Sequence, residues 1–343
     1  MKTLLLVTDI WMPQVSGITT VLSATVRELE KREWKVVVIH PGLFKTIPFP
    51  LYPEIQLALF PGRKIRKIFE ETKPDYVHIA VEWMLGPSAR RYCIRNNIPF
   101  TTAYHANINF NAELYIGSLG GITSYLADAY MRWFHGRADK TLVSNETLRA
   151  QLAARGFKNL VLWPFGVDTE LFKRNESSTI DPGLPKPIFV YFGRIAKEKS
   201  IEEFLDAPLP GSKLVIGDGP YRGHLESKYG RIARFVGYKK GQELVDWLSV
   251  CDVYVFPSRS ETFGLTVLEG FACGLPVAAH DAMGPKDIVT NGVDGYISEN
   301  LAEVAVKCLS LSREACRKKA LQYSWDLSVE AFMSHQVEIR RRI

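Results

Sequence analysis

Short apolar runs alternate with segments of helical periodicity along the whole chain. The runs of the first half are LLLVT, KVVVIH, YVHIA, PFTTAY, KTLVSN and VLWPFG. Those of the second half are IFVYFG, KLVIG, ARFVG, VYVFPS and PVAAH. Continuous apolar strands separated by helices are typical of parallel sheets that are covered on both faces. The pattern therefore predicts an α/β protein with two such sheets, one in each half of the chain.

A polar segment separates the two sets of strands. Residues 173–187, KRNESSTIDPGLPKP, are rich in turn-forming residues and have neither helical nor strand periodicity. A length of 343 residues suits two domains of about 150 residues each. We therefore expect a first domain over 1–172, a linker over 173–187 and a second domain over 188–324. Helical spacing returns at 325–343, and the spacing alone assigns this helix to neither domain.

The composition is that of an ordinary globular chain. Hydrophobic residues make up 46% and charged residues 23%, which indicates neither disorder nor a membrane-embedded class. The apolar run in the opening MKTLLLVTDI is too short for a signal peptide or a membrane span, and we expect a buried strand there. Five cysteines without C-x-x-C spacing favour buried free thiols in a reducing compartment. These features predict a cytoplasmic protein.

Several function classes lack their sequence signatures. The segment after the first strand, TDIWMPQVSG, does not contain the G-x-G-x-x-G of a dinucleotide site. The chain also has no Walker-type G-x-x-x-x-G-K-[ST] and no G-x-S-x-G elbow. A nicotinamide dehydrogenase, a P-loop NTPase and an α/β-hydrolase are therefore not supported. We expect no nucleic-acid partner.

The stretch SRSETFGLTVLEGFACG follows one predicted strand and carries two carboxylates. The spacing of its apolar residues predicts a helix from about Phe263 to Gly274, with Glu261 in the loop before it and Glu269 on it. The free amides at a helix start attract anions, and Gly264 has no side chain to keep an anion away. A carboxylate such as Glu269 can accept two hydrogen bonds from a ribose diol. Taken alone, a helix cap and a solvated face residue explain the two glutamates better.

Three further segments come after other predicted strands or form a turn in the same region. Arg194 and Lys199 follow IFVYFG, where they could clamp a diphosphate, although each alone could be an ordinary surface cation. The sequence GDGP at 217–220 ends another strand, and GPKDI at 284–288 is a glycine-proline turn. Ligands of such folds bind outside the carboxyl ends of the strands. Together these segments predict a diphosphate site in the gap between the two domains.

The motifs together resemble a known enzyme family. The order G-R-x-x-x-E-K, G-D-G-P, F-V-G and P-S-x-x-E-x-F-G-L-x-x-L-E is similar to the nucleotide-sugar half of retaining glycosyltransferases of sequence family four. In the first half, T-D-x-W-x-P-Q-V-x-G-I, D-Y-V-H-I-A, F-T-T-x-Y-H and G-V-D-T-x-L-F resemble bacterial GDP-mannose-dependent α-mannosyltransferases and relatives that make glycolipids and sulfolipids. The resemblance implies the GT-B fold, in which two Rossmann-like domains face a central cleft.

The resemblance also assigns site residues, position by position. The implied catalytic residues are His105, Arg194, Lys199 and Glu261. The implied donor-binding residues are Gly17, Arg194, Lys199, Gly217, Val236, Phe263, Gly264, Leu265 and Glu269. Among them Arg194 and Lys199 would bind the diphosphate, Glu269 the ribose, and His105 the sugar near the reaction centre. The last helix would pack back on the first domain.

The function implied is transfer of a hexosyl group, with mannose from GDP-mannose as the first candidate, to an acceptor hydroxyl of a lipid or glycolipid. The family retains the configuration at the anomeric carbon without an obvious protein nucleophile. Because the sequence has no Asp-x-Asp, we expect no metal and no other cofactor. The alternatives are a transferase that uses UDP-glucose, UDP-galactose or UDP-sulfoquinovose, and a non-hydrolysing sugar-nucleotide epimerase. A catalytically silent binding protein is a third class.

Basic and aromatic segments of the first half are candidates for the acceptor side. In 61–71 the cations Arg63, Lys64, Arg66 and Lys67 surround an apolar helix face, which suits an anionic inner membrane surface at about 1 kcal/mol per cation. A solvated helix explains them as simply. The aromatic residues of 110–134 could form an apolar acceptor mouth or pack in a core. Glu82 could reach either substrate or cap a helix, and His78 is expected to be structural.

Overall fold

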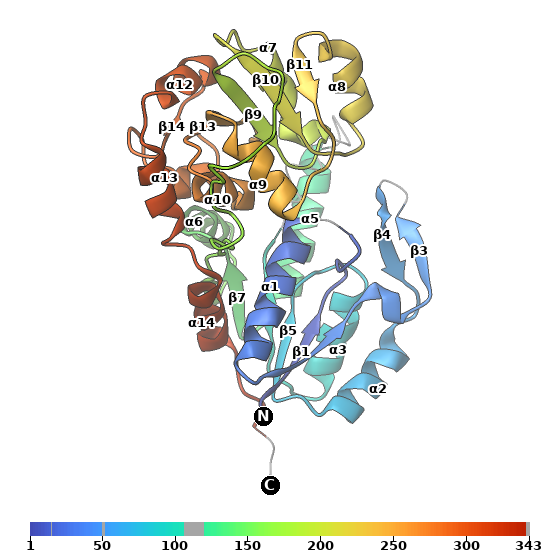
Figure 1. Cartoon of the computed structure of the whole chain (residues 1–343). Helices are drawn as coiled ribbons and strands as arrows, with labels where there is room; N and C mark the ends of the chain where they lie inside the picture. The colour runs from blue at the N-terminus through green and yellow to red at the C-terminus, as the bar shows by residue number, and fades with distance from the viewer. Residues whose placement is uncertain (15, 50–51, 106–119, 341–343) are drawn as a thin grey trace. The chain divides into compact units, whose positions relative to one another are not determined.

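The computed structural model describes residues 1–14, 16–49, 52–105 and 120–340. Contacts between residues divide the chain into two units (Figure 1). The first unit comprises Met1–Phe165 and Trp325–Ile343, and the second comprises Gly166–Ser324. Each unit is described separately.

The first unit is built on a parallel sheet. Its strands, in spatial order, are β2 (Lys35–Ile39), β1 (Thr3–Val7), β5 (Tyr76–Ile79), β6 (Thr101–Ala103), β7 (Lys140–Val143) and β8 (Leu160–Leu162). Its helices are α1 (Gly17–Lys31), α2 (Gly62–Thr72), α3 (Leu85–Arg95), α5 (Gly120–His135), α6 (Glu146–Ala154) and α14 (Trp325–His335). The strands β3 (Thr46–Phe49) and β4 (Tyr52–Ala58) form an antiparallel hairpin, which the 3-10 turn η1 (Pro41–Leu43) precedes.

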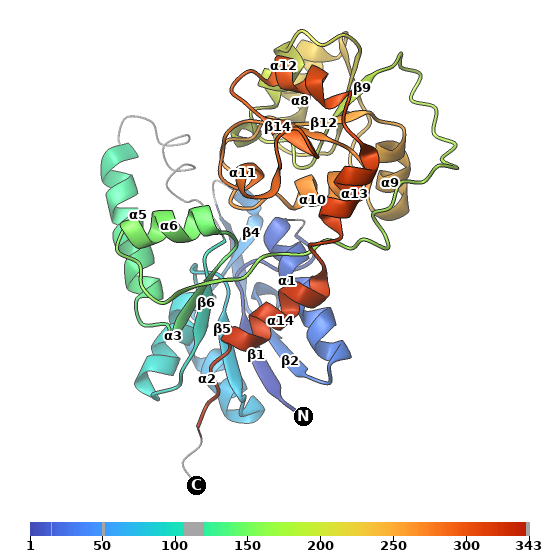
Figure 2. The same cartoon turned by 90° about the vertical axis from the view of Figure 1, so that its left-hand side faces the viewer.

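Helices cover both faces of this sheet because side chains of a strand point alternately to its two faces. Val77 of β5 belongs to one core with Ile65 of α2 and Leu85 of α3. The neighbouring His78 points the other way and meets Phe332 of α14, with ring centroids 5.0 Å apart. Helix α14 in turn contacts α1 (Figure 2). Burial on both faces explains the continuous apolar run of β1, residues 4–7.

The second unit repeats the architecture. Its parallel sheet has the order β11 (Ala233–Phe235), β10 (Ser212–Ile216), β9 (Ile188–Phe192), β12 (Val253–Phe256), β13 (Val277–Ala279) and β14 (Gly295–Ile297). Its helices are α7 (Ile201–Asp206), α8 (Arg222–Tyr229), α9 (Gly241–Ser249), α10 (Leu265–Ala272), α11 (Pro285–Ile288), α12 (Leu301–Cys308) and α13 (Arg313–Ala320), with a 3-10 turn η3 (Lys197–Lys199). The predicted α/β class with two Rossmann-like parallel sheets is confirmed.

The boundary between the units differs from the expected one. We expected the first domain to extend to residue 172 and a separate linker over 173–187, but 166–187 groups with the second unit. Long-range hydrogen bonds explain the difference. Arg317 donates to the carbonyls of Thr169 at 2.7 Å and Phe172 at 2.5 Å, and Asn175 N donates to Ser249 Oγ at 2.8 Å.

Two features of the structure bear on the class of protein. The five cysteines are free and buried, and burial raises the pKa of Cys273, Cys308 and Cys316 to about 12, so these thiols stay protonated at neutral pH. In the part of the chain that the structure describes, no helix is both long and apolar enough to cross a bilayer.

The packing of α14 predicts how the first unit responds to substitution. Phe332 is fully buried against His78 and Trp163, whereas Leu327 on the same helix is 55% exposed. We expect Phe332→Ala to lower the free energy of unfolding by about 3–5 kcal/mol, because it leaves a cavity. The control Leu327→Ala should change it by about 0.5 kcal/mol or less. Urea unfolding measures both, and equal losses would contradict the role of α14 in this unit.

Candidate functional site

In the second unit the predicted donor residues lie where neighbouring strands end. Gly193 and Arg194 follow β9, Gly217 follows β10, and the loop that leads into α10 follows β12. These strands are adjacent and parallel, so their carboxyl ends share one edge of the sheet. Val236 follows β11 at the same edge, where its N–H donates to Val215 O at 3.1 Å.

The glycines of GDGP serve close backbone packing between two of these loops. A Cβ on Gly217 would lie 1.9 Å from Gly193 O, and a Cβ on Gly219 would lie 2.3 Å from Ile195 O. Both glycines have a positive φ, of 153° and 155°. Ile195 N also donates to Asp218 O at 2.9 Å. The segment therefore fixes the loop that carries Arg194, and the donor contact that the resemblance implies for Gly217 stays a prediction.

Lys199 and Glu261 form an ion pair. The distance from Nζ to Oε2 is 2.7 Å, and the two side chains are 20% and 25% exposed. The loop before α10 is also joined to η3 by Ser260 Oγ, which donates to Glu198 O at 3.1 Å. The structure thus brings together two predicted site residues that are 62 positions apart, and Glu261 offsets the charge of Lys199.

The backbone at Arg194 is fixed by a buried tyrosine. The Tyr191 hydroxyl donates to Arg194 O at 2.8 Å. Burial raises the pKa of Tyr191 above its ordinary value, and the charges of Glu261 and Glu198 raise it further. Tyr191 therefore remains a hydrogen-bond donor at neutral pH, and its hydrogen bond fixes the backbone at Arg194.

Helix α10 begins at Leu265, close to the predicted start. Its N-cap is Gly264, which has φ 94° and ψ 60° and no side chain to cap the first turn. Phe263 is buried, and its carbonyl is approached by Gly284, where a Cβ would come within 2.6 Å. The GPKDI turn, which contains α11, therefore packs directly on the loop that leads into α10. This contact explains the glycine at 284.

Glu269 lies on α10 with an unusual carboxylate. The residue is half-buried, and burial raises its pKa to about 7. Among the described residues none donates a hydrogen bond to this carboxylate. A carboxylate in such surroundings ordinarily has a partner. Its acceptor capacity is therefore available to a ligand with two donor groups, such as a diol.

In the first unit Asp9 is a residue that sequence reasoning missed. It follows β1, and its Oδ1 accepts the N–H groups of Met84 at 2.9 Å and Leu85 at 2.8 Å, while Oδ2 accepts that of Gly86 at 3.3 Å. Asp9 thus caps α3, and burial raises its pKa to about 6. We had considered Glu82 as a helix cap, but the residue that caps α3 is Asp9. An aspartate directly after a buried strand was the available signal.

Glu82 is 5% exposed and follows β5. Burial raises its pKa to about 7, and the neighbouring charge of Asp9 contributes in the same direction. The Tyr130 hydroxyl donates to its backbone carbonyl. The carboxylate itself has no role in the α3 cap.

His105 follows β6 and lies in an aromatic environment. Its ring is 5.9 Å from those of Trp163 and Phe165, and burial lowers its pKa to about 4. His105 is therefore neutral at pH 7 and can take part in hydrogen bonds to hydroxyls but cannot supply a positive charge. His78 accepts or donates a bond to Thr101 Oγ1 at 2.8 Å and is fully buried, which fits the expected structural role.

Gly17 is the first residue of α1. Its predecessor Ser16 caps the helix, and Ser16 Oγ accepts the Thr19 N–H at 3.1 Å. Gly17 is exposed at this helix start. Its predicted contact with donor phosphates stays a prediction.

The basic helix 61–71 of the sequence corresponds to α2. Its apolar side is already used, because Ile65 and Phe69 are buried in the core of the unit. The cations Arg63, Lys64, Arg66 and Lys67 are exposed. Two of them pair with acids of the same helix: Arg66 with Glu70 at 2.8 Å and Lys67 with Glu71 at 3.6 Å.

The aromatic stretch 110–134 lies partly outside the described residues. Within α5, Phe134 belongs to the core, whereas Tyr125 and Trp133 are exposed. Trp133 is covered on one side by the Arg90 guanidinium, 4.1 Å from the ring centroid. Part of α5 therefore offers aromatic surface to solvent.

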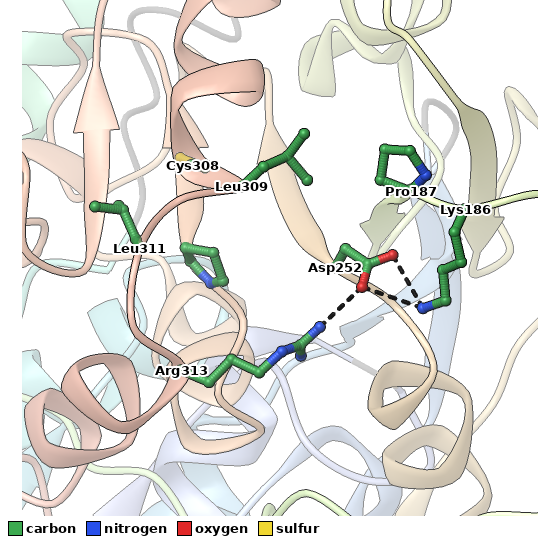
Figure 3. Close-up of a pocket in the computed structure, with 8 residues that line it drawn as sticks. Lys186, Pro187, Asp252, Cys308, Leu309, Leu311 and Arg313 are labelled. Carbon is green, nitrogen blue, oxygen red and sulfur yellow. Dashed lines mark hydrogen bonds and ion pairs between the residues drawn. The ribbon is translucent and has the colours of Figure 1, made fainter.

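A pocket of about 510 Å³ lies at the opposite edge of the second sheet (Figure 3). Lys186, Asp252 and Pro276 line it just before β9, β12 and β13 begin. Asp252 pairs with Lys186 at 2.9 Å and with Arg313 at 3.0 Å. None of the predicted donor residues lines this pocket. Across 1–14, 16–49, 52–105 and 120–340, no group of three or more His, Cys, Asp or Glu side chains is placed to hold a metal ion.

Two family models match the chain. The model described as Glycosyltransferase Family 4 matches residues 15–171, and the one described as Glycosyl transferases group 1 matches 186–314. The sucrose-phosphate synthase of Thermosynechococcus elongatus superimposes with a TM-score of 0.79 at 19% identity, covering 97% of this chain and 98% of that one.

Characterised relatives are similar over much of the chain. A GDP-mannose-dependent alpha-mannosyltransferase of Mycobacterium tuberculosis (strain CDC 1551 / Oshkosh) is 27% identical over 98% of this chain and 97% of its own. The sulfoquinovosyl transferase SQD2 of Arabidopsis thaliana is 33% identical over 73% of this chain and 51% of its own. The alpha-monoglucosyldiacylglycerol synthase of Streptococcus pneumoniae (strain ATCC BAA-255 / R6) is 24% identical over 95% and 82%.

The glycine packing predicts a large cost for a single methyl group. Gly217→Ala should lower the free energy of unfolding by at least about 2 kcal/mol, because the backbone of Gly193 cannot give way and φ is positive. The matched control is Gly223→Ala in α8, where no atom lies within 4 Å of the new Cβ. It should stay within about 1 kcal/mol of wild type. Urea unfolding that gives similar values for both would contradict this role of Gly217.

The raised pKa of Glu269 predicts a pH-dependent stability. Between pH 4.5 and about 7 the folded state binds more protons than the unfolded state, so this residue makes stability fall as pH rises. Glu269→Gln removes that contribution. The stability of the variant relative to wild type should therefore be greater at pH 8 than at pH 5, measured by chemical unfolding at both values. A difference that is constant, or larger at pH 5, would show that the carboxylate is not desolvated.

Proposed function

Since the chain belongs to the glycosyltransferases of family four, which have the GT-B fold, we propose that it transfers a hexosyl group from a nucleotide sugar to an acceptor hydroxyl with retention of configuration. GDP-mannose is the preferred donor in this proposal. The full-length similarity to a GDP-mannose-dependent alpha-mannosyltransferase supports it.

The donor assignment depends on the surroundings of the Glu269 carboxylate. Its carboxylate is desolvated and receives no hydrogen bond from a described residue, yet it lies on the helix that starts at Gly264. A ribose diol would supply two donors at once. In the proposal Glu269 binds the ribose, and the amides of the first turn of α10 receive a phosphate.

The proposed diphosphate clamp consists of Arg194 and Lys199. Their charges would oppose the negative charge that grows on the diphosphate as the bond to the anomeric carbon breaks. The Lys199–Glu261 pair holds Lys199 in one position before the donor binds. Glu261 can at the same time accept hydrogen bonds from donor hydroxyls. No metal is part of this proposal.

His105 is proposed to contact a sugar hydroxyl. Because burial keeps its imidazole neutral at pH 7, it can donate one hydrogen bond and accept another, depending on the tautomer. Gly17, Val236, Phe263 and Leu265 are retained in the proposal as backbone contacts to the donor. Gly217 enters it indirectly, through the loop that carries Arg194.

The donor sugar has a second candidate. The relatives named as a sulfoquinovosyl transferase and an alpha-monoglucosyldiacylglycerol synthase support sulfoquinovose or glucose as the alternative sugar. In this alternative the nucleotide is UDP. An epimerase would interconvert nucleotide sugars without any acceptor, so incubation of the protein with donor alone separates that class.

For the acceptor we propose a lipid or glycolipid hydroxyl at an anionic membrane face on the cytoplasmic side. The relative named as a monoglucosyldiacylglycerol synthase supports a lipid acceptor. The exposed cations of α2 and the exposed aromatics of α5 support contact with lipid. Because the apolar side of α2 is buried in the core, contact through this helix would be electrostatic and would weaken as salt is added.

Removal of either clamp cation tests the donor assignment. With wild type, we expect transfer of labelled hexose from GDP-mannose or a UDP-sugar to lipid acceptors. Arg194→Ala and Lys199→Ala should each lower kcat by about 100-fold or more, since a preorganised charge is lost. The control is Lys197→Ala, an exposed cation of the same 3-10 turn, which should keep turnover close to wild type.

Two outcomes would contradict the proposal. Turnover within a few-fold of wild type in Arg194→Ala or Lys199→Ala would remove the clamp. Interconversion of nucleotide sugars without acceptor, in place of transfer, would make the protein an epimerase.

A further inference from the structure

We propose that Glu82, with Asp9 beside it, forms the polar part of the acceptor site, and that the acceptor group bound there is an uncharged polyol or sugar, not a phosphate or a carboxylate. The inference rests on the proposed transfer to an acceptor hydroxyl. It names the chemical class of that acceptor.

The position of Glu82 is the first argument. Strands β1, β5 and β6 are neighbours in the parallel sheet of the first unit. Asp9, Glu82 and His105 follow these three strands in turn, so all three lie at the edge where the strands end. Ligands of open parallel sheets bind outside this edge.

The second argument is that the Glu82 carboxylate has no structural role among the described residues. Asp9 receives the amides at the start of α3, so Glu82 is not needed as a cap. Among the described residues only the backbone N–H of Glu82 itself donates to its carboxylate. Buried acids are rarely left without a partner, because an unpaired buried charge costs several kcal/mol. A buried acid without a partner at this edge of the sheet is therefore a candidate for substrate binding.

The sign of the local charge is the third argument. Asp9 raises the pKa of Glu82, and Glu82 in turn raises the pKa values of Tyr104 and Tyr130. No described cation contributes to the pKa of Glu82.

Two arginines of the same unit have other partners. Arg155 donates to Asp128 with 3.0 Å between Nε and Oδ2. Arg90 donates to the carbonyls of Phe134 at 2.9 Å and Trp133 at 2.6 Å.

These charges discriminate between acceptor groups. At pH 8, where Asp9 and Glu82 are both mostly ionised, a phosphate or carboxylate at Glu82 would meet two like charges in a poorly solvated place, where repulsion is strong. Hydroxyl groups would instead donate hydrogen bonds to the carboxylate, and a vicinal pair could satisfy both oxygens.

The test compares, at pH 8, acceptor pairs that differ by one phosphate group. Wild-type protein is given alkyl hexosides and glycerol glycosides, and each is matched by its monophosphate. We expect kcat/KM for the neutral member to exceed that for the phosphorylated member by about tenfold or more, the factor that corresponds to a hydrogen bond to a charged group. This comparison needs no variant.

Glu82→Gln then tests the residue itself. The variant keeps the shape and removes the charge, so it should raise KM for neutral acceptors by about tenfold and reduce the preference over the phosphorylated partners. Binding of GDP or UDP to the variant should stay at the wild-type affinity. Glu33→Gln, the same change at an exposed position, should keep both KM and the preference.

Three results would overturn the inference. They are a better rate with the phosphorylated member of any pair, donor hydrolysis without glycosylation of any neutral acceptor, and wild-type KM and preference in Glu82→Gln. Failure of the proposed function is a different result, because wild type would then neither bind GDP or UDP nor hydrolyse nucleotide sugar.

Discussion

A carboxylate placed inside a protein without a cation beside it raises the free energy of the folded state, and this chain does so in both of its units. Asp9 and Glu82 are buried beside the ends of β1 and β5, and Glu269 is desolvated on α10. Of these three acids, only Asp9 has a structural role, because its carboxylate accepts hydrogen bonds from the amides at the start of α3. For the two glutamates we propose ligands that bring hydroxyl groups to them.

The backbone around the proposed donor site is closely packed. The loops after β9 and β10 touch at Gly193 and Gly217, and Gly284 lies against Phe263 before α10. Each contact excludes even a methyl group, so the loops have little freedom to shift. The ion pair between Lys199 and Glu261 holds these two side chains together. Preorganised charge of this kind stabilises a departing diphosphate without reorganisation during the reaction.

Much of the fold followed from local patterns, whereas the pairing of side chains did not. The strands were predictable because burial on both faces leaves continuous apolar runs, and α10 was predictable from Leu265, Leu268 and Phe271. The pair of Lys199 with Glu261 joins loops 62 positions apart, and no periodicity encodes such a contact. The same holds for the cap that Asp9 provides to α3, 75 positions later. The unit boundary was misplaced because Arg317 ties Thr169 and Phe172 to the second unit. For Gly217 the structure shows a packing role against Gly193, and the donor contact that the resemblance implies stays a prediction.

The central claim is that the second unit binds a nucleoside diphosphate at the carboxyl edge of its sheet, between Arg194, Lys199 and Glu269. A crystal structure of the protein with GDP or UDP tests it most directly. The account predicts diphosphate oxygens within hydrogen-bond distance of the Arg194 guanidinium and Lys199 Nζ, and ribose hydroxyls on the Glu269 carboxylate. A nucleotide bound instead in the pocket between Lys186 and Arg313, or one whose ribose does not contact Glu269, would contradict it.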